Sequence, residues 1–159
     1  DSCEVPADFH PRFQKTVKTY EYRILNREFP LPAYRFNSHF TYRKLDVERM
    51  RQAAAYLIGE HDFQSFCAAG AQVKTTVRTI YGLDVKKQGD LIIIRITGNG
   101  FLYNMVRIIA GTLMKIGQGD WEPERMSEIL AGCDRQLAGP TAPAKGLTLM
   151  EIHFKGEKG

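Results

Sequence analysis

The sequence predicts a single α+β domain in which helices cover one face of an antiparallel or mixed sheet. Three observations lead to this fold. A β-hairpin pattern occupies residues 73–97, a long apolar helical pattern follows it at once, and further strand patterns lie toward both ends, at 16–25 and 147–154. With 159 residues, 43% of them hydrophobic, the chain is long enough to bury a core without disulfides.

The N-terminal part begins with an expected loop over residues 1–15, followed by a strand over residues 16–25. The strand is predicted because β-branched and aromatic residues dominate it. Side chains two positions apart lie on the same side of a strand, so Tyr20, Tyr22 and Ile24 are expected to share one face.

A long irregular loop is expected over residues 26–44, which contain two prolines and several aromatic and basic residues. Asp46 is a candidate N-cap for a helix that runs to Gly59. A turn with two aromatic residues follows at 60–66. The buried stripe of the helix is expected to consist of Val47, Met50, Ala54, Leu57 and Ile58.

The hairpin is the clearest local pattern of the chain. Residues 73–86 alternate between apolar and polar side chains, with a bulge expected at Gly82. A tight turn at residues 88–90 leads into a strand at 91–97. The second strand begins with four consecutive apolar residues, so both its faces are covered and it is expected to be central in the sheet.

The stretch from Gly98 to Gly119 predicts a buried helix, because apolar side chains fill nearly all of its circumference. Arg107 is the exception. A guanidinium does not lose its charge, so a buried arginine needs a carboxylate, a phosphate or several carbonyls as partners. Arg107 is therefore a candidate functional residue. The simpler alternative is an arginine that reaches solvent or forms an ion pair for structural reasons alone.

The C-terminal part contains a short predicted helix that starts near Trp121 and Pro123. A loop rich in proline, glycine and alanine is expected over residues 138–146, and a last strand over 147–154. We assign residues 1–155 to one domain and 156–159 to a polar tail.

Charge, cysteine spacing and the absence of several motifs restrict the classes of protein to which the chain could belong. The net charge of +4 and the pI of about 9.0 fit a polyanionic partner without requiring one. The three cysteines, Cys3, Cys67 and Cys133, are scattered, as expected for reduced thiols in a cytoplasmic protein. The sequence contains no apolar run long enough to cross a membrane, no phosphate-binding loop, no metal-ligand spacing and no nucleophile elbow. A nucleotide hydrolase and a metalloenzyme are disfavoured.

Two further groups are candidates for RNA contacts. Tyr20 and Tyr22 could stack on an unpaired base, although strand tyrosines more often pack in the core. Basic and aromatic residues also alternate along the first 43 positions, which suits RNA as well as an ordinary solvated face. This basic set consists of Arg12, Lys15, Lys18, Arg23, Arg27, Arg35 and Arg43.

Six short runs, in this order and spacing, closely resemble the C-terminal part of bacterial tRNA pseudouridine synthases of the TruA type. The most specific is the F-L-x-x-M-V-R-x-I-x-G pattern of residues 101–111. The resemblance extends from about Val5 to Phe154. The other runs are Phe9-His10-Pro11-Arg12-Phe13, Tyr20-Glu21-Tyr22, Gly59 to Phe66, Val77-Arg78-Thr79-Ile80 and Ala142 to Leu147.

The resemblance implies an isomerase that converts uridine to pseudouridine in the anticodon stem-loop of tRNA. It implies a homodimer in the cytoplasm, no cofactor and no metal, and tRNA as the partner in place of DNA or a membrane. Tyr20 matches the tyrosine that stacks on the target base, and Arg107 matches the arginine that pairs with the catalytic carboxylate. RNA contacts are expected from Arg12, Lys15, Lys18, Arg78 and Asn104.

The chain departs from the family pattern at one decisive point. The family's nucleophile is an aspartate in an R-T-D-x-G motif, and the Arg-Thr pair of this chain, Arg78-Thr79, is followed by Ile80. The motif is expected upstream of Asp1, so the chain alone is expected to be inactive. Two alternatives remain open: a non-catalytic α+β RNA-binding module of the RRM kind, and a purely structural or oligomerisation domain.

Overall fold

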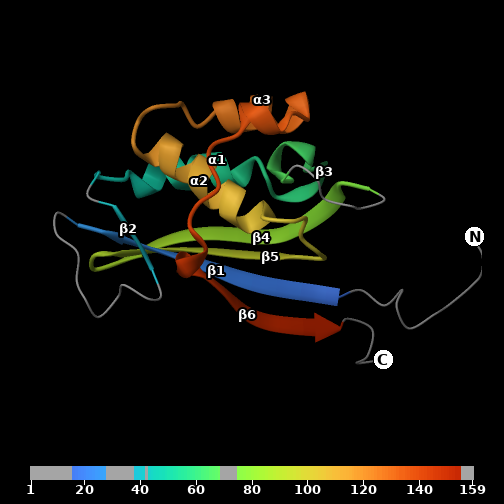
Figure 1. The fold of residues 1–159 in the computed structure, drawn as a ribbon, viewed down its shortest axis with the longest axis horizontal. Coiled ribbons are helices and arrows are strands. Elements are labelled where there is room, and N and C mark those ends of the chain that lie inside the picture. The colour runs from blue at the N-terminus through green and yellow to red at the C-terminus, as the bar shows by residue number, and fades with distance from the viewer. Residues whose placement is uncertain (1–15, 28–37, 42, 69–74, 155–159) are drawn as a thin grey trace, which may run out of the picture.

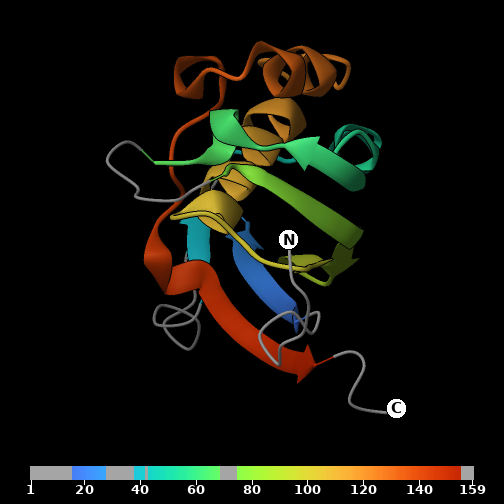
Figure 2. The same cartoon turned by 90° about the vertical axis from the view of Figure 1, so that its right-hand side faces the viewer.

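The computed structural model describes residues 16–27, 38–41, 43–68 and 75–154. Within them, a six-stranded mixed sheet forms one layer and the helices form another, all on the same face of the sheet (Figures 1 and 2). This arrangement confirms the predicted α+β fold class.

Strand β1 (Thr16–Asn26) organises the sheet, because it pairs on both of its sides. On one side it runs antiparallel to β5 (Leu91–Gly98), which pairs in turn with β4 (Val77–Gln88), and β4 pairs with β3 (Gly59–Asp62). On its other side β1 pairs antiparallel with β6 (Leu147–Phe154) along its first part. Its last three residues pair in parallel with β2 (His39–Thr41).

The predicted hairpin is confirmed. β4 and β5 pair from Gln88 and Leu91 outward, and Gly89 occupies the left-handed region with φ 62° in the turn between them. The register shifts between Ile80 and Gly82, which is the expected bulge. β5 is central, and its isoleucines at 92, 94 and 96 are almost completely buried beneath the helices.

Helix α2 (Met105–Gly117) is buried on nearly all sides, as its sequence predicted. Helix α1 (Val47–Ala55) packs beside it, and α3 (Arg125–Gly132) lies on the outer side of the helical layer (Figure 1). Asp46 caps α1 as expected, since its carboxylate accepts hydrogen bonds from the backbone N–H groups of Glu48 at 3.0 Å and Arg49 at 3.3 Å.

Several predicted element boundaries are wrong. Helix α1 ends at Ala55, not at Gly59, because the following N–H groups form turn bonds three residues back, and Ile58 is 45% exposed. The expected loop 26–44 contains β2, and the expected turn 60–66 contains β3 followed by a 3-10 helix at Gln64–Phe66. Helix α2 begins at Met105, after an irregular segment that includes Phe101.

Candidate active site

Tyr20 and Arg107 line the same cleft, whose volume is about 290 Å³. Tyr20 comes from β1 and Arg107 from the first turn of α2, so the cleft lies where the sheet meets the start of the buried helix. The remaining lining is largely apolar and comes from the segment before α2, from the first residues of α2, and from β6 with the 3-10 helix before it: Phe101, Leu102, Tyr103, Asn104, Met105, Val106, Ala144 and Leu147.

The Tyr20 ring is held by its neighbours on the sheet. Its backbone pairs with Ile96 of β5 and with Leu149 of β6, directly beside a bulge in the β1–β6 register. The ring meets Phe101 edge to face, with centroids 5.2 Å apart and an interplanar angle of 88°. The contact fixes one side of the ring, while the side chain stays partly exposed in the cleft.

The Arg107 guanidinium is half-buried and makes two hydrogen bonds. Its Nε donates to the carbonyl oxygen of Ala142 at 2.7 Å, and its Nη1 donates to Oδ1 of Asn104 at 3.2 Å. Within the described part of the chain, Arg107 forms no ion pair with a carboxylate. A buried guanidinium needs polar partners, and the two carbonyl oxygens of Ala142 and Asn104 fill that role in part.

Residues 138–146, which we call the strap, connect the helical layer to β6 along one side of the molecule (Figure 2). The strap lies directly on α2: the N–H of Ala142 donates to the carbonyl of Arg107 at 3.0 Å, and the N–H of Gly139 donates to Oγ1 of Thr112 at 2.9 Å. Gly111 allows this approach, since a Cβ at that position would lie 1.8 Å from the carbonyl oxygen of Pro140.

Tyr22 holds the next residue of the strap from the sheet side. Its hydroxyl donates to the carbonyl oxygen of Pro143 at 2.6 Å, and its ring is completely buried. Burial raises the pKa of Tyr22 well above its usual value, and the nearby positive charge of Arg107 offsets only part of that rise. Of the two tyrosines considered for base stacking, Tyr22 is therefore a core residue and Tyr20 lines the cleft.

Two of the expected RNA-binding residues lie near the segment that leads to α2. Lys18 is paired with Gly98 across β1 and β5. The Arg78 side chain runs along Gly100, and its Nη1 donates to the carbonyls of Thr75 and Val77 at 2.9 and 2.7 Å. Arg12 and Lys15 lie outside the described residues, and Asn104, in the cleft wall, bonds to Arg107.

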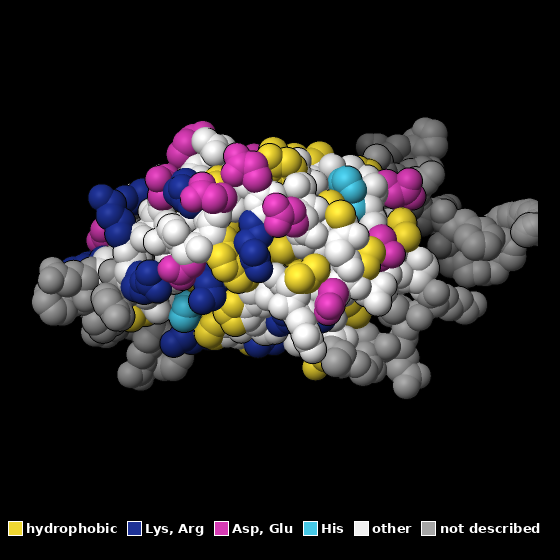
Figure 3. Space-filling view, turned by 90° about the horizontal axis from the view of Figure 1, so that it is seen from above, with side chains coloured by type: hydrophobic (Ala, Val, Ile, Leu, Met, Phe, Trp, Pro, Cys, Tyr) yellow, Lys and Arg dark blue, Asp and Glu magenta, His cyan; other side chains and the backbone are white. Residues whose placement is uncertain are grey.

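Several members of the basic set are already paired with acidic side chains. Arg23 lies 3.4 Å from Glu21, Arg27 lies 3.4 Å from Asp90, and Arg43 lies 3.5 Å from Asp120. Arg35 lies outside the described residues. Acidic and basic side chains are also interspersed over the helical face (Figure 3). These observations favour an ordinary solvated surface for the paired arginines.

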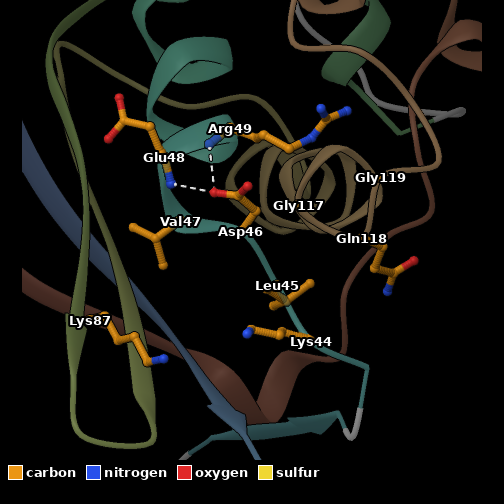
Figure 4. A pocket seen from close by; sticks show the side chains of 10 residues that line it. All are labelled: Lys44, Leu45, Asp46, Val47, Glu48, Arg49, Lys87, Gly117, Gln118 and Gly119. Atoms are coloured by element: carbon orange, nitrogen blue, oxygen red, sulfur yellow. Dashed lines mark hydrogen bonds between the residues drawn. The ribbon is translucent and has the colours of Figure 1, made fainter.

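A second hollow, of about 630 Å³, lies at the start of α1 and the end of α2. Figure 4 shows that Lys44 and Lys87 extend into it from opposite sides. Asp46 is engaged as the cap of α1, and the wall mixes both signs of charge. None of the described residues that line this hollow is aromatic, so the smaller cleft with Tyr20 is the better candidate for a site that receives a base.

Sequence reasoning did not identify two aromatic residues of the cleft. Phe101 supports the Tyr20 ring, and Tyr103 is 63% exposed at the cleft wall. Both residues closely follow the glycines at 98 and 100, a sequence that favours an irregular segment. The apolar helical pattern of residues 101–116 includes this segment, so the sequence predicts a helix there instead. An aromatic wall facing a guanidinium can receive a planar ring on one side and an anionic group on the other.

Among the described residues, no group of three or more His, Cys, Asp and Glu side chains is arranged to hold a metal ion. None of the helices in the same ranges combines the length and the apolar character that a membrane span requires. Cys67 and Cys133 are free thiols, while Cys3 lies outside the described part.

A family model and the similar curated proteins carry the same description. Residues 53–155 match the family model described as tRNA pseudouridine synthase. The chain is 54% identical over 152 residues to tRNA pseudouridine synthase A of Brevibacillus brevis, an alignment that covers 95% of the chain and 62% of the relative. It is 47% identical over 152 residues to the same-named protein of Bacillus pumilus, with coverages of 95% and 61%. It is 44% identical over 155 residues to the same-named protein of Geobacter sp. (strain M21), an alignment that covers 97% of the chain and 63% of the relative.

Proposed function

The chain belongs to the tRNA pseudouridine synthase family, and we propose that it forms part of an enzyme that isomerises uridine to pseudouridine in the anticodon stem-loop of tRNA. It spans 61–63% of the length of the three relatives compared above. In this proposal the chain supplies the shelf for the target base, a guanidinium for the catalytic carboxylate and part of the RNA surface. The nucleophilic aspartate belongs to a segment outside these 159 residues.

One observation carries the proposal: Tyr20 and Arg107, which the family resemblance assigns to the active site, line one cleft. A base that leaves its stack needs a planar surface to receive it, and Tyr20 offers such a surface. A carboxylate that must stay ionised is favoured by an adjacent guanidinium, which Arg107 offers.

The proposed reaction is an isomerisation and balances without a cofactor. The N1–C1′ bond of uridine breaks, the uracil turns, and a C5–C1′ bond forms. The proton on C5 leaves and N1 gains a proton. The aspartate acts as a carboxylate on the sugar or the base, Arg107 holds it ionised, and Tyr20 stacks on the base and assists removal of the C5 proton.

The proposal also assigns residues to the surface that contacts tRNA. Lys18 and Arg78, with Arg12 and Lys15, are assigned to phosphate contacts, which supply affinity without reading sequence. Asn104 lines the cleft and bonds to Arg107, and the RNA contact expected of it from the sequence stays a prediction. The intact enzyme is proposed to work as a homodimer in the cytoplasm.

The direct test is release of tritium from tRNA labelled at C5 of uridine. The intact protein is expected to release tritium with each turnover, and the 159-residue chain alone is expected to release none. Turnover by the chain alone would contradict the assignment of the nucleophile to another segment. Absence of turnover by the intact protein, with tRNA binding that weakens steeply with salt, would favour the non-catalytic RNA-binding module. Absence of both would favour a structural domain.

A further inference from the structure

We propose that Asn104 is a positioning residue, held in a left-handed backbone conformation so that its side-chain oxygen orients the Arg107 guanidinium in the cleft. The inference rests on the proposed function, because it assigns Arg107 a carboxylate partner. It gives Asn104 a role that acts through Arg107 in place of direct contact with RNA.

The backbone of Asn104 is the first observation. With φ 62° and ψ 12°, it is one of two non-glycine residues with positive φ among the described positions, the other being Cys133. Asparagine tolerates this region better than most residues, at a cost that is still on the order of 1 kcal/mol. Such a conformation persists only where the surrounding structure holds it.

Helix capping does not explain this conformation. Asn104 occupies the N-cap position of α2, where an asparagine side chain usually accepts a hydrogen bond from the helix backbone. Here the side chain makes no such bond, and Oδ1 accepts from Nη1 of Arg107 at 3.2 Å. The residue gives up its ordinary capping interaction and bonds to the guanidinium.

The two bonds of Arg107 restrict how a carboxylate can approach it. Ala142 accepts from Nε at 2.7 Å and so occupies the edge formed by Nε and Nη2. A bidentate partner on that edge is excluded, and the terminal edge, with Nη2 and the one Nη1 proton that Asn104 does not accept, remains for the carboxylate. Asn104 fixes the orientation of this terminal edge because it bonds to Nη1.

The strap provides the second fixed point. Ala142 is held by two hydrogen bonds to Arg107, one from the side chain and one to its backbone carbonyl. The adjacent Pro143 is held by the buried hydroxyl of Tyr22. The acceptor of Nε is therefore itself rigid, and Asn104 is the remaining determinant of how the guanidinium is rotated.

The test is Asn104→Gly in the intact protein, because glycine keeps the left-handed backbone and removes the whole side chain, including the oxygen that bonds to Arg107. Cys133→Gly is the matched control, since it changes the same kind of backbone position at the end of α3. We expect kcat for tritium release to fall about 10- to 100-fold for the first variant, with KM for tRNA unchanged. The control should keep the wild-type kcat, and both variants should melt close to the wild type.

Two further readouts separate positioning from a general structural effect. In Asn104→Gly the acidic limb of the kcat profile should move to higher pH, because a poorly oriented guanidinium lowers the pKa of the carboxylate less. In nitrogen-15-edited NMR spectra, the Nη protons of Arg107 should give separate signals in the wild type. In Asn104→Gly, rotation of the guanidinium should average these signals.

A wild-type kcat and pH profile for Asn104→Gly would overturn the proposal, and so would a defect confined to KM, which would assign Asn104 to RNA binding. Arg107→Lys in the same assay distinguishes the two levels of inference. If Arg107→Lys is inactive while Asn104→Gly is normal, the positioning role fails alone. If Arg107→Lys is also normal, the carboxylate-holding role of Arg107 fails, whereas failure of the proposed function would appear as no tritium release by the wild-type intact protein.

Discussion

Substitution of Gly111 by alanine should separate the strap from α2. The added Cβ would lie 1.8 Å from the carbonyl oxygen of Pro140 and 2.9 Å from its carbonyl carbon. Both are backbone atoms, so a change of rotamer cannot relieve the overlap. The strap has to move until the 1.8 Å contact approaches the 3.4 Å at which ordinary van der Waals contact begins.

The cost follows from the bonds that such a movement breaks. Three hydrogen bonds join the strap to α2: Ala142 N–H to Arg107 O at 3.0 Å, Arg107 Nε to Ala142 O at 2.7 Å, and Gly139 N–H to Thr112 Oγ1 at 2.9 Å. At a net value of about 1 kcal/mol each, their loss reduces the free energy of unfolding by about 3 kcal/mol. Overpacking alone, with the strap in place, costs a similar amount, about 1 to 3 kcal/mol.

Urea denaturation of the 159-residue chain measures this effect. We expect the midpoint for Gly111→Ala to fall by about 1 to 2 M with the slope unchanged. Gly82→Ala is the matched control, because nothing lies within 4 Å of a Cβ at that position. It should leave the free energy of unfolding within about 0.5 kcal/mol of the wild type. A Gly111→Ala midpoint equal to that of the control would refute the close packing of strap and helix.

Three further predictions concern capping, pH and RNA binding. Asp46→Ala removes two bonds at the start of α1 and should destabilise the chain by about 1 kcal/mol, lowering the melting temperature by about 3 °C. Because burial raises the pKa of Tyr22 above its ordinary value of 10.0, the folded state keeps a proton that the unfolded state releases above that pH. The free energy of unfolding should therefore fall as pH rises past 10, and Tyr22→Phe should show a fall that is shallower by up to about 1.4 kcal/mol per pH unit; parallel curves would contradict this. Lys18→Ala and Arg78→Ala should each reduce the magnitude of the slope of the logarithm of the tRNA-binding constant against the logarithm of salt concentration by about one, the value for one phosphate contact, in the intact protein. An unchanged slope would show that the substituted residue does not contact a phosphate.

The elements predicted correctly are those whose pattern is local. β1, the β4–β5 hairpin, α2 and β6 each carry a period in their own residues, and Asp46 is a capping residue directly before its helix. β2 and β3 carry no such period. The three residues of β2 and the Gly-Glu-His-Asp of β3 become strands because β1 and β4 offer them backbone partners distant in sequence. Such pairing is not encoded in the short segment itself.

The site shows the same division. A charged residue in an apolar helix marked Arg107 as unusual, but its partner Ala142 lies 35 residues away in a loop without periodicity. The left-handed turn at Asn104 also interrupts a helical pattern that appears continuous from Phe101 onward. The pairing of Tyr20 with Arg107 was expected from the family resemblance, because neither composition nor spacing brings these two residues together.

The central claim is that Arg107 holds the catalytic carboxylate, and kcat of Arg107→Lys in the intact protein tests it most directly. Lysine keeps the positive charge but lacks the planar fork that receives a carboxylate through two bonds. We predict a fall in tritium release of at least about 100-fold, with the melting temperature within a few degrees of the wild type. Turnover close to that of the wild type would contradict the account.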